Sequence, residues 1–440
     1  MSSKGGRKGQ RTRQAPGSET RKVAAQTVAR VLAGNSLDTL LEEALARVSE
    51  REQGFLRELA TGAVRHAISL QADIDRFLRE PLRPRDRDVL ACLLVGAHQL
   101  RNLRVPDFAA IDSCVSAARG TRKPWAPGLV NAVLRKVAAS EAPQVHNAPE
   151  WLVDTLREDF PEDWEHLLAV SDSRAPMTLR INPRRSTPTA YLQALAAAGL
   201  EGTTGELGTG SVVLTEAVSQ TTLPHNSCGL FTIQDEGAQL AGMLLQAACA
   251  NPGRLLDACA APGGKASDLL ERWPGAEHTF LEVDGKRLAM TRERLRHWPG
   301  QQVRWIEGDA CDPDSWWDGH AFDAILVDAP CSGTGSLRRN PDIRLLRRAS
   351  DIPNLAQLQR SMLAALWPLL APGGHLLYVT CSLLGEENED VVEAFLESEA
   401  SASVEPLAVP NATPRRTGML LPPRAGANDG FYFALLRKSK

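Results

Sequence analysis

Residues 255–265, Leu-Leu-Asp-Ala-Cys-Ala-Ala-Pro-Gly-Gly-Lys, restrict the possible folds of this 440-residue chain more than any other stretch. Two apolar residues followed by an acid predict a buried strand, and the Pro/Gly segment predicts a short loop before a helix that begins at about Ala266. A strand that turns sharply into a helix points free backbone N–H groups and a helix N-terminus at one spot. The stretch therefore predicts a seat for a cofactor.

The same stretch argues against two common cofactors. A phosphate-binding G-x-x-x-x-G-K loop needs glycine at position 259, where Cys259 stands. The dinucleotide pattern G-x-G-x-x-G is also absent from it. Neither ATP nor NAD is therefore the expected ligand.

The rest of the C-terminal half predicts the fold that carries this seat. From residue 253 onward, short apolar segments alternate with helical ones, which is typical of a parallel, doubly wound sheet. The expected strands cover 255–258, 279–283, 303–306, 324–327, 375–380 and 431–436. Ligands of such sheets bind beyond the carboxyl ends of the strands. The functional side chains are therefore expected at those ends.

Acidic residues stand at the ends of the first four expected strands, namely Asp257, Glu282, Asp309 and Asp328. A single acid in such a place is often only a helix cap. Four in succession favour a ligand: Glu282 is placed to hold the hydroxyls of a ribose, and the turn at Asp309 to reach an adenine edge. A sulfonium also favours nearby carboxylates. The predicted cofactor is S-adenosylmethionine.

Two cysteines follow the fourth and fifth strands, in Asp-Ala-Pro-Cys-Ser-Gly (328–333) and Thr-Cys-Ser (380–382). Neighbouring strands lie ~4.8 Å apart, so Cys331 and Cys381 should emerge side by side. Helix dipoles and Lys265 can lower the pKa of a thiol there. Cys259, a third thiol at this edge, lies in the cofactor loop and is expected to make backbone contacts.

A methyl donor beside a thiolate suits one reaction in particular. Carbon 5 of a pyrimidine is a poor nucleophile, but a thiolate added to carbon 6 turns the ring into an enamine that attacks a methyl group from carbon 5. Asp328 is the candidate acid beside the third ring nitrogen. Methylation of oxygen or nitrogen needs no such thiol. Spacing alone does not decide which cysteine is the nucleophile.

The chain before residue 253 divides into further regions. Apolar residues at three- and four-residue steps, with prolines between the runs, predict an all-α domain without strands. The predicted regions are a basic disordered tail (1–22), the all-α domain (23–140), a linker and helix (141–172), a small α/β subdomain (173–233) and the cofactor domain (234–440). Basic residues flank the helices of the all-α domain and are either a solvated face or a face that contacts RNA phosphates.

Other patterns exclude several classes of protein. No stretch approaches the ~20 apolar residues of a membrane helix. The eight cysteines and nine histidines show no metal-ligand spacing and no disulfide framework. We expect a cytoplasmic monomer without a membrane partner and without a metal.

Five motifs together resemble the Sun family of RNA cytosine-C5 methyltransferases. They are 257–265, 328–335, Thr-Cys-Ser at 380–382, Arg-Ile-Asn-Pro at 180–183 and Asn-Pro-Asp-Ile-Arg at 340–344. The front half resembles the NusB-like RNA-binding fold, on the segments 100–112 and 130–135. The resemblance implies a Rossmann-like class I methyltransferase domain preceded by a small α/β subdomain and an all-α NusB-like domain. It also implies 16S rRNA as the substrate.

The resemblance assigns roles to individual residues. Cys381 would be the nucleophile on carbon 6 of the cytosine, and Cys331 would assist release of the methylated product. The cofactor would be lined by Cys259, Ala260, Ala261, Pro262, Gly263, Gly264, Lys265, Glu282, Asp309 and Asp328. Glu282 replaces a more usual aspartate, and a longer carboxylate can still hold a ribose diol.

Five arginines after the fourth strand are expected to contact RNA phosphates and to hold a flipped base in the pocket. They are Arg338, Arg339, Arg344, Arg347 and Arg348. Two alternatives stay open on these grounds. One is an RNA-binding assembly factor whose methyltransferase fold is idle, and the other is a methyltransferase for another RNA, for DNA or for free nucleotides.

Overall fold

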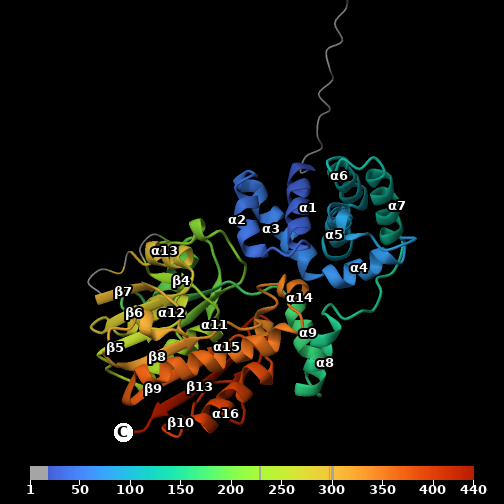
Figure 1. Ribbon diagram of the computed structural model, residues 1–440. Helices are drawn as coiled ribbons and strands as arrows, with labels where there is room; N and C mark the ends of the chain where they lie inside the picture. Colours follow the sequence, from blue (N-terminus) through green and yellow to red (C-terminus); the bar gives the residue numbers. More distant parts are fainter. Residues whose placement is uncertain (1–17, 227–228, 297, 299–301) are drawn as a thin grey trace, which may run out of the picture. The chain divides into compact units, whose positions relative to one another are not determined.

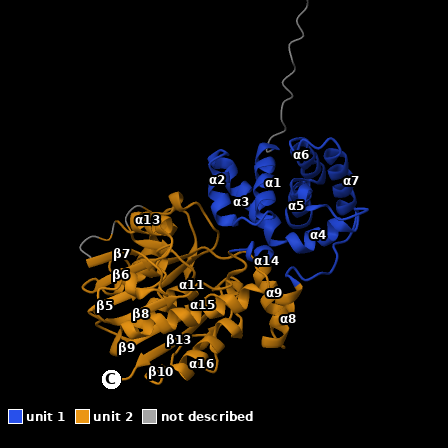
Figure 2. Ribbon diagram, in the orientation of Figure 1, with its two compact units in different colours: residues 1–149, 340–346 blue, residues 150–339, 347–440 orange. Residues whose placement is uncertain are grey.

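The computed structural model describes residues 18–226, 229–296, 298 and 302–440. The chain forms two compact units (Figures 1 and 2). Of the described residues, the first unit holds 18–149 together with 340–346, and the second holds those between 150 and 339 and those from 347 to 440. The short segment 340–346 therefore belongs to the first unit, although it follows strand β8 (Phe322–Asp328) of the second unit in sequence.

The first unit is helical, as the apolar spacing predicts. Its main helices are α1 (Ser18–Val31), α2 (Leu37–Leu45), α3 (Glu50–Arg65), α4 (Ala67–Asp75), α5 (Arg87–Asn102), α6 (Asp107–Arg119) and α7 (Ala126–Ala138). The segment 340–346 adds the short α14 (Ile343–Leu346). Apolar residues three and four apart put one face of each long helix inside, where Val28, Leu56, Leu93 and Val133 share one core.

The start of α1 corrects the expected disordered tail. Residues 18–22, included in that tail, form the first turn of α1. Arg21 is buried, and its Nε donates to Oε1 of Gln99 at 2.7 Å. A basic residue that looked like part of a solvated run thus has a fixed partner on α5. The remaining residues of the expected tail, 1–17, lie outside the described residues.

The second unit begins with two helices and a small sheet. Helices α8 (Glu150–Asp159) and α9 (Trp164–Asp172) precede a four-stranded antiparallel sheet of order β2-β3-β1-β4. Its strands are β1 (Thr178–Ile181), β2 (Gly202–Thr204), β3 (Ser211–Leu214) and β4 (Phe231–Ile233), and α10 (Pro188–Ala197) packs on them. Helix α11 (Glu236–Ala248) follows, with Asp235 as its N-cap.

A nine-stranded sheet carries the rest of the unit. Its order is β11-β12-β13-β9-β8-β5-β6-β7, with β10 beside β13. The strands are β5 (Arg254–Asp257), β6 (Glu277–Glu282), β7 (Gln302–Glu307), β8 (Phe322–Asp328), β9 (Leu370–Thr380), β10 (Ala402–Glu405), β11 (Thr413–Pro414), β12 (Met419–Leu421) and β13 (Phe431–Lys438). Strands β5 to β9 are parallel, but β13 runs antiparallel to β9, so the sheet is mixed rather than parallel throughout.

Helices cover both faces of this sheet. Leu377 and Val379 of β9 share a core with α11 and with α12 (Gly264–Arg272). Tyr378, between them, points to the opposite face and bonds to Gln359 of α15 (Asp351–Leu366). The remaining helices are α13 (Gly285–Arg294) and α16 (Glu389–Ser398). The alternation confirms the doubly wound architecture and brings the ends of β5, β6, β8 and β9 to one edge.

Candidate active site

The loop after β5 has the geometry of a cofactor seat. Gly263 adopts a left-handed conformation with φ of +99° and caps α12. A Cβ at this position would lie only 2.9 Å from Cγ2 of Thr291 on α13. Only glycine satisfies both demands, the backbone angle and the close approach of α13. The N-terminus of α12 consequently opens directly behind the loop.

Two buried oxygen atoms beside this loop have no partner within the described part of the chain. Oδ1 of Asp257 accepts a hydrogen bond from the Cys259 amide at 3.3 Å, but Oδ2 accepts none. Oε1 of Gln234, whose amide lies next to Gly264, also accepts none. Burial, and next the charge of Asp328, raise the pKa of Asp257 to about 7. Buried acceptors without donors are costly, and a ligand with an ammonium group would satisfy them.

Glu282 is buried at the end of β6 and faces the same loop. Its Oε2 accepts from the Ala261 amide at 3.3 Å, and its Oε1 pairs with Nη1 of Arg287 at 3.2 Å. The Glu282 side chain therefore supports the cofactor loop by a hydrogen bond, and it lies at the end of β6, where the sequence predicts an acid. Asp309 is exposed after β7, and its Oδ1 accepts from the Cys311 amide at 2.8 Å.

Asp328, the last residue of β8, pairs with Lys265 of α12. Nζ of Lys265 lies 2.6 Å from Oδ2 of Asp328, whose side chain keeps 29% of its surface exposed. Burial alone lowers the pKa of Lys265, but the charge and the hydrogen bond of Asp328 outweigh it, and the net shift is upward. The lysine is thus firmly charged and holds an accessible carboxylate at the edge of the sheet.

The two predicted cysteines lie in contact. Sγ of Cys331 is 3.4 Å from Sγ of Cys381. Strands β8 and β9 pair in parallel, and the Gly335 amide of the first loop donates to the carbonyl of Cys381 at 2.8 Å. The register of two neighbouring strands and one backbone bond therefore place the thiols together.

The surroundings of the two thiols differ in charge. A hydrogen bond from Cys331 is the main factor that lowers the pKa of Cys381. Burial and the charge of Asp328 oppose this shift, and the Lys265 ammonium adds to it. The same bond is the main factor that raises the pKa of Cys331, followed by burial, the charge of Cys381 and the charge of Glu387. Cys381 is accordingly the sulfur that ionises first, with Cys331 as its hydrogen-bond donor.

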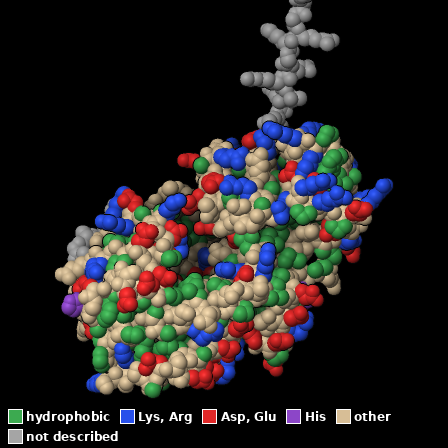
Figure 3. Space-filling view, in the orientation of Figure 1, with side chains coloured by type: hydrophobic (Ala, Val, Ile, Leu, Met, Phe, Trp, Pro, Cys, Tyr) green, Lys and Arg blue, Asp and Glu red, His purple; other side chains and the backbone are tan. Residues whose placement is uncertain are grey.

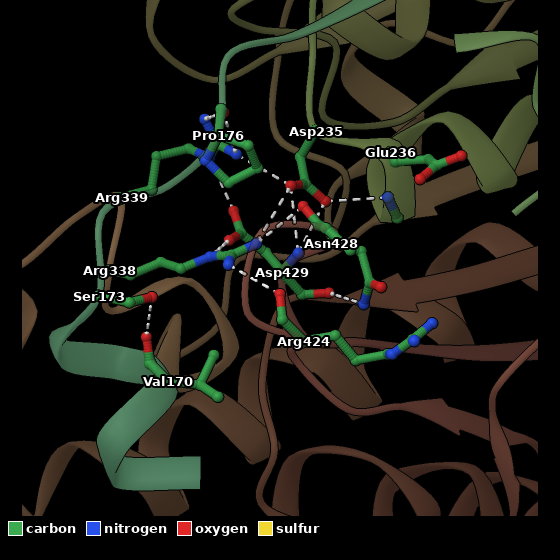
Figure 4. Close-up of polar contacts among 12 residues, drawn as sticks. Val170, Ser173, Pro176, Asp235, Glu236, Arg338, Arg339, Arg424, Asn428 and Asp429 are labelled. Carbon is green, nitrogen blue, oxygen red and sulfur yellow. Dashed lines mark hydrogen bonds and ion pairs between the residues drawn. The ribbon is translucent and has the colours of Figure 1, made fainter. Parts of the chain in front are cut away.

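The arginines after β8 correct the expected RNA contacts. Arg338 is only 1% exposed and donates to Oδ1 of Asp429 at 2.5 Å, while Arg339 pairs with Asp429 and Asp235 at 2.7 and 2.9 Å (Figure 4). These side chains tie β13 and the N-cap of α11 to the β8 loop. The prediction of phosphate contacts is wrong for Arg338, because a buried guanidinium shared between carboxylates cannot reach a phosphate.

The other three arginines have different surroundings. Arg344 is buried in the first unit, where it donates to the carbonyls of Arg65 and Asn147 at 2.9 and 2.6 Å, so its predicted phosphate contact is wrong as well. Arg347 donates to the carbonyl of Cys331 at 3.2 Å and thereby supports the thiol loop. Arg348 is exposed.

Two residues that lie at the site were not predicted from the sequence, Gln234 beside the cofactor loop and Glu387 behind the thiols. Glu387 is fully buried and bonds to both thiol loops. It stands in an acidic run, Glu-Glu-Asn-Glu at 386–389, that reads as solvated surface. Within the described residues, no group of His, Cys, Asp and Glu is arranged to hold a metal ion, and no helix is long and apolar enough to span a membrane.

Comparisons with known proteins place these features in a family. A family model described as 16S rRNA methyltransferase RsmB/F matches residues 244–437. A NusB family model matches 18–139, and a ferredoxin-like domain model of RsmF/B-like methyltransferases matches 148–221. The NusB-like resemblance of the front half and the methyltransferase fold of the back half are thereby confirmed.

Individual relatives cover nearly the whole chain. Ribosomal RNA small subunit methyltransferase B of Pseudomonas putida is 42% identical over 95% of this chain and 98% of its own length. Among solved structures, a protein named PH0851 has a TM-score of 0.82 at 21% identity, covering 97% of this chain and 99% of its own. A methyltransferase homologue from Pyrococcus horikoshii has a TM-score of 0.56 at 25% identity, covering 66% and 99%. The chain belongs to the 16S rRNA methyltransferase RsmB/F family.

Proposed function

We propose that this protein transfers a methyl group from S-adenosylmethionine to carbon 5 of a cytosine in 16S rRNA, through a covalent bond between Cys381 and carbon 6. The observation that carries the proposal is the contact between Cys331 and Cys381, whose sulfur atoms lie 3.4 Å apart, together with the lowered pKa of Cys381, to which the hydrogen bond from Cys331 contributes most. A methyltransferase acting on oxygen or nitrogen has no use for two thiols in contact at the ligand edge.

The residues around the β5 loop fit the proposed cofactor, which supplies an electrophilic methyl group when bound. The unpartnered oxygens of Asp257 and Gln234 suit its ammonium group. Glu282 and Asp309 are proposed to hold the ribose and the adenine, and the backbone of 259–265 is proposed to line the methionine part. Asp328, held by Lys265, is proposed to border both the cofactor and the cytosine.

The proposed chemistry runs through this chain's own side chains. The Cys381 thiolate adds to carbon 6, and the electron pair of the bond between carbons 5 and 6 moves toward the third ring nitrogen. That nitrogen takes up the proton that Asp328 shares with the Lys265 ammonium, and it returns the proton when the adduct collapses. Carbon 5 then attacks the methyl carbon, and the bond from that carbon to the sulfonium breaks. A base removes the carbon-5 proton, the bond between sulfur and carbon 6 breaks, and Cys331 assists this release.

The first unit offers a surface for the RNA backbone. Lys and Arg side chains gather over helices α6 and α7 (Figure 3). The exposed basic residues there and around the start of α5 are Arg83, Arg85, Arg87, Arg119, Arg122, Arg135 and Lys136. Lys123 is instead paired with Asp86 at 3.0 Å. Exposed guanidinium groups attract phosphates without reading sequence. With 16S rRNA as partner, we place the protein in the cytoplasm and propose that it acts as a monomer.

The test is methyl transfer to defined acceptors. The purified protein and S-adenosylmethionine labelled on the methyl group are incubated with unmodified 16S rRNA, with DNA of the same sequence and with free cytidine. We expect label in the RNA alone, at one cytosine that then resists bisulfite conversion. Label on another atom of the RNA, or transfer to DNA or cytidine at the same rate, would contradict the proposal.

A further inference from the structure

Glu387 is a buried carboxylate for which the proposed reaction has no step. It ends a short 3-10 turn (Gly385–Glu387) after β9, and its exposed fraction is 0%. None of the ion pairs of the described residues includes it. A buried charge without a cation is costly unless several hydrogen bonds compensate for it. Its place behind the thiols therefore needs an explanation.

The hydrogen bonds of this carboxylate reach both thiol loops. Oε1 accepts from the amide of Ser332 at 2.8 Å, and Oε2 accepts from Oγ of Ser382 at 2.6 Å. Ser332 is the residue directly after Cys331, and Ser382 is the residue directly after Cys381. One side chain thus joins the two loops one residue beyond each sulfur.

A second layer fixes the carboxylate itself. Nε2 of Gln359 on α15 donates to Oε1 of Glu387 at 3.1 Å and to the carbonyl of Pro330 at 2.9 Å. The Tyr378 hydroxyl contacts Oε1 of Gln359 at 3.1 Å and the carbonyl of Glu387 at 2.7 Å. Because all of these groups are buried, the carboxylate has one defined position relative to both loops.

We propose that Glu387 is a positioning residue that fixes the two thiol loops against each other and directs the shared proton to Cys331. The proposal rests on the proposed function, in which Cys381 attacks as a thiolate. The hydrogen bonds from Ser332 and Ser382 to Glu387, each one residue beyond a cysteine, support its role in fixing the two loops. The distribution of charge around the two sulfurs supports its role in directing the shared proton to Cys331.

Charged and titratable groups face the thiol pair from several elements. Asp328 of β8 raises the pKa of Cys381, and Lys265 of α12 lowers it. Glu387 acts on Cys331, as does Tyr378 from β9. Because Asp328 and Lys265 act on Cys381 in opposite directions, the charge that distinguishes the two sulfurs is that of Glu387, which favours the proton on Cys331.

The test compares Glu387→Gln with Glu386→Gln. Glutamine keeps the shape of the side chain and removes the charge, and the neighbouring Glu386 is exposed, so its substitution is the matched control. Initial rates of alkylation by iodoacetamide are measured across pH for the peptides of Cys331 and Cys381 separately, by mass spectrometry. Methyl transfer and thermal unfolding are measured on the same samples.

For Glu387→Gln we expect the ratio of Cys331 to Cys381 alkylation to rise by about tenfold, the change that one pKa unit produces. We also expect a lower kcat with an unchanged KM for S-adenosylmethionine. Glu386→Gln should behave as the wild type. If the alkylation ratio in Glu387→Gln equals that of the wild type, the proposal is overturned. This conclusion also holds for a partly folded variant, because the ratio is then taken from its folded fraction.

A second variant tests the bridge between the loops. Glu387→Ala removes both acceptors, and we expect diamide to join Cys331 to Cys381 at least about tenfold more slowly than in Glu386→Gln. An unchanged rate would overturn the positioning role. The thiol readouts use no RNA, so they stay meaningful if the wild type transfers no methyl group to RNA. In that case the proposed function fails, and the alkylation ratios still decide the role of Glu387.

Discussion

The loops that carry Cys331 and Cys381 follow neighbouring parallel strands, and each continues with a serine. They differ in what surrounds the sulfur. The hydrogen bond from Cys331 and the Lys265 ammonium lower the pKa of Cys381. The same hydrogen bond and the buried carboxylate of Glu387 raise the pKa of Cys331. Two identical side chains thus have pKa values shifted in opposite directions by groups on other elements. Chemistry is therefore set by the neighbours of a cysteine as much as by the cysteine itself.

Removing the sulfur of Cys381 should have the largest effect. In Cys381→Ala, methyl transfer to 16S rRNA should fall by at least about three orders of magnitude, because the step on carbon 6 loses its nucleophile. Binding of S-adenosylmethionine, measured by calorimetry, should stay within about twofold of the wild type. Cys249→Ala, at the far end of α11, is the control. Wild-type activity in Cys381→Ala would remove the difference between the two loops altogether.

Removing the other sulfur should block a later step. In Cys331→Ala, steady-state turnover should fall by about two orders of magnitude, the usual loss when a proton-transfer group is removed. Protein bound to RNA should accumulate and should survive denaturation on a gel. Cys331→Ser retains a hydrogen-bond donor toward Cys381, so less of the RNA-bound protein should accumulate with this variant. If neither variant forms such a species, the loop of Cys331 has no part in product release.

Lys265 contributes to the difference between the two sulfurs by lowering the pKa of Cys381, and its removal should reduce that difference. Because the ammonium lowers the pKa of Cys381, Lys265→Met should raise that pKa and move the alkylation profile of Cys381 to higher pH. A shift of one unit reduces the thiolate fraction about tenfold below the pKa. Alkylation of Cys311, outside this contact, serves as the internal reference. A profile that stays in place would mean that the lysine acts only on Asp328.

The smallest effect on the chemistry should come from the ion pairs that anchor the Cys331 loop to β13. Arg338→Met leaves the buried Asp429 without one of its partners, which should lower the free energy of unfolding by about 3 kcal/mol. Arg348→Met, an exposed neighbour, should change it by less than about 0.5 kcal/mol. Urea unfolding measures both. Equal effects would contradict the assignment of Arg338 to the interior.

Six strands of the large sheet, the edge that carries the site and the contact of the two cysteines follow from local patterns, whereas the short strands β10, β11 and β12 were not predicted. Apolar runs mark strands, and parallel pairing brings their carboxyl ends together. The place of an arginine is not readable in this way, because its partner is distant: Arg338 lies 91 residues from Asp429. Glu387 escaped for the same reason, since a buried acid and a solvated one look alike until the serine and glutamine that bond to it are placed.

The boundary of the helical unit shows a related limit. The basic residues near position 20 are typical of a solvated tail. Arg21 nevertheless belongs to α1, is buried and has Gln99 of α5 as its hydrogen-bond partner. The segment 340–346 reads as part of the methyltransferase domain, yet it is packed with the helical unit, where the Leu37 amide donates to Asp342 at 2.9 Å. Composition describes a segment, whereas membership of a core depends on distant residues.

The central claim is that Cys381, and no other sulfur, bonds to the target base. The most direct measurement isolates the denaturation-resistant complex of Cys331→Ala with 16S rRNA, digests both components and locates the linkage by mass spectrometry. The account predicts one cytosine, methylated on carbon 5 and joined through carbon 6 to Sγ of Cys381. A linkage to any other cysteine, such as Cys259, would contradict it.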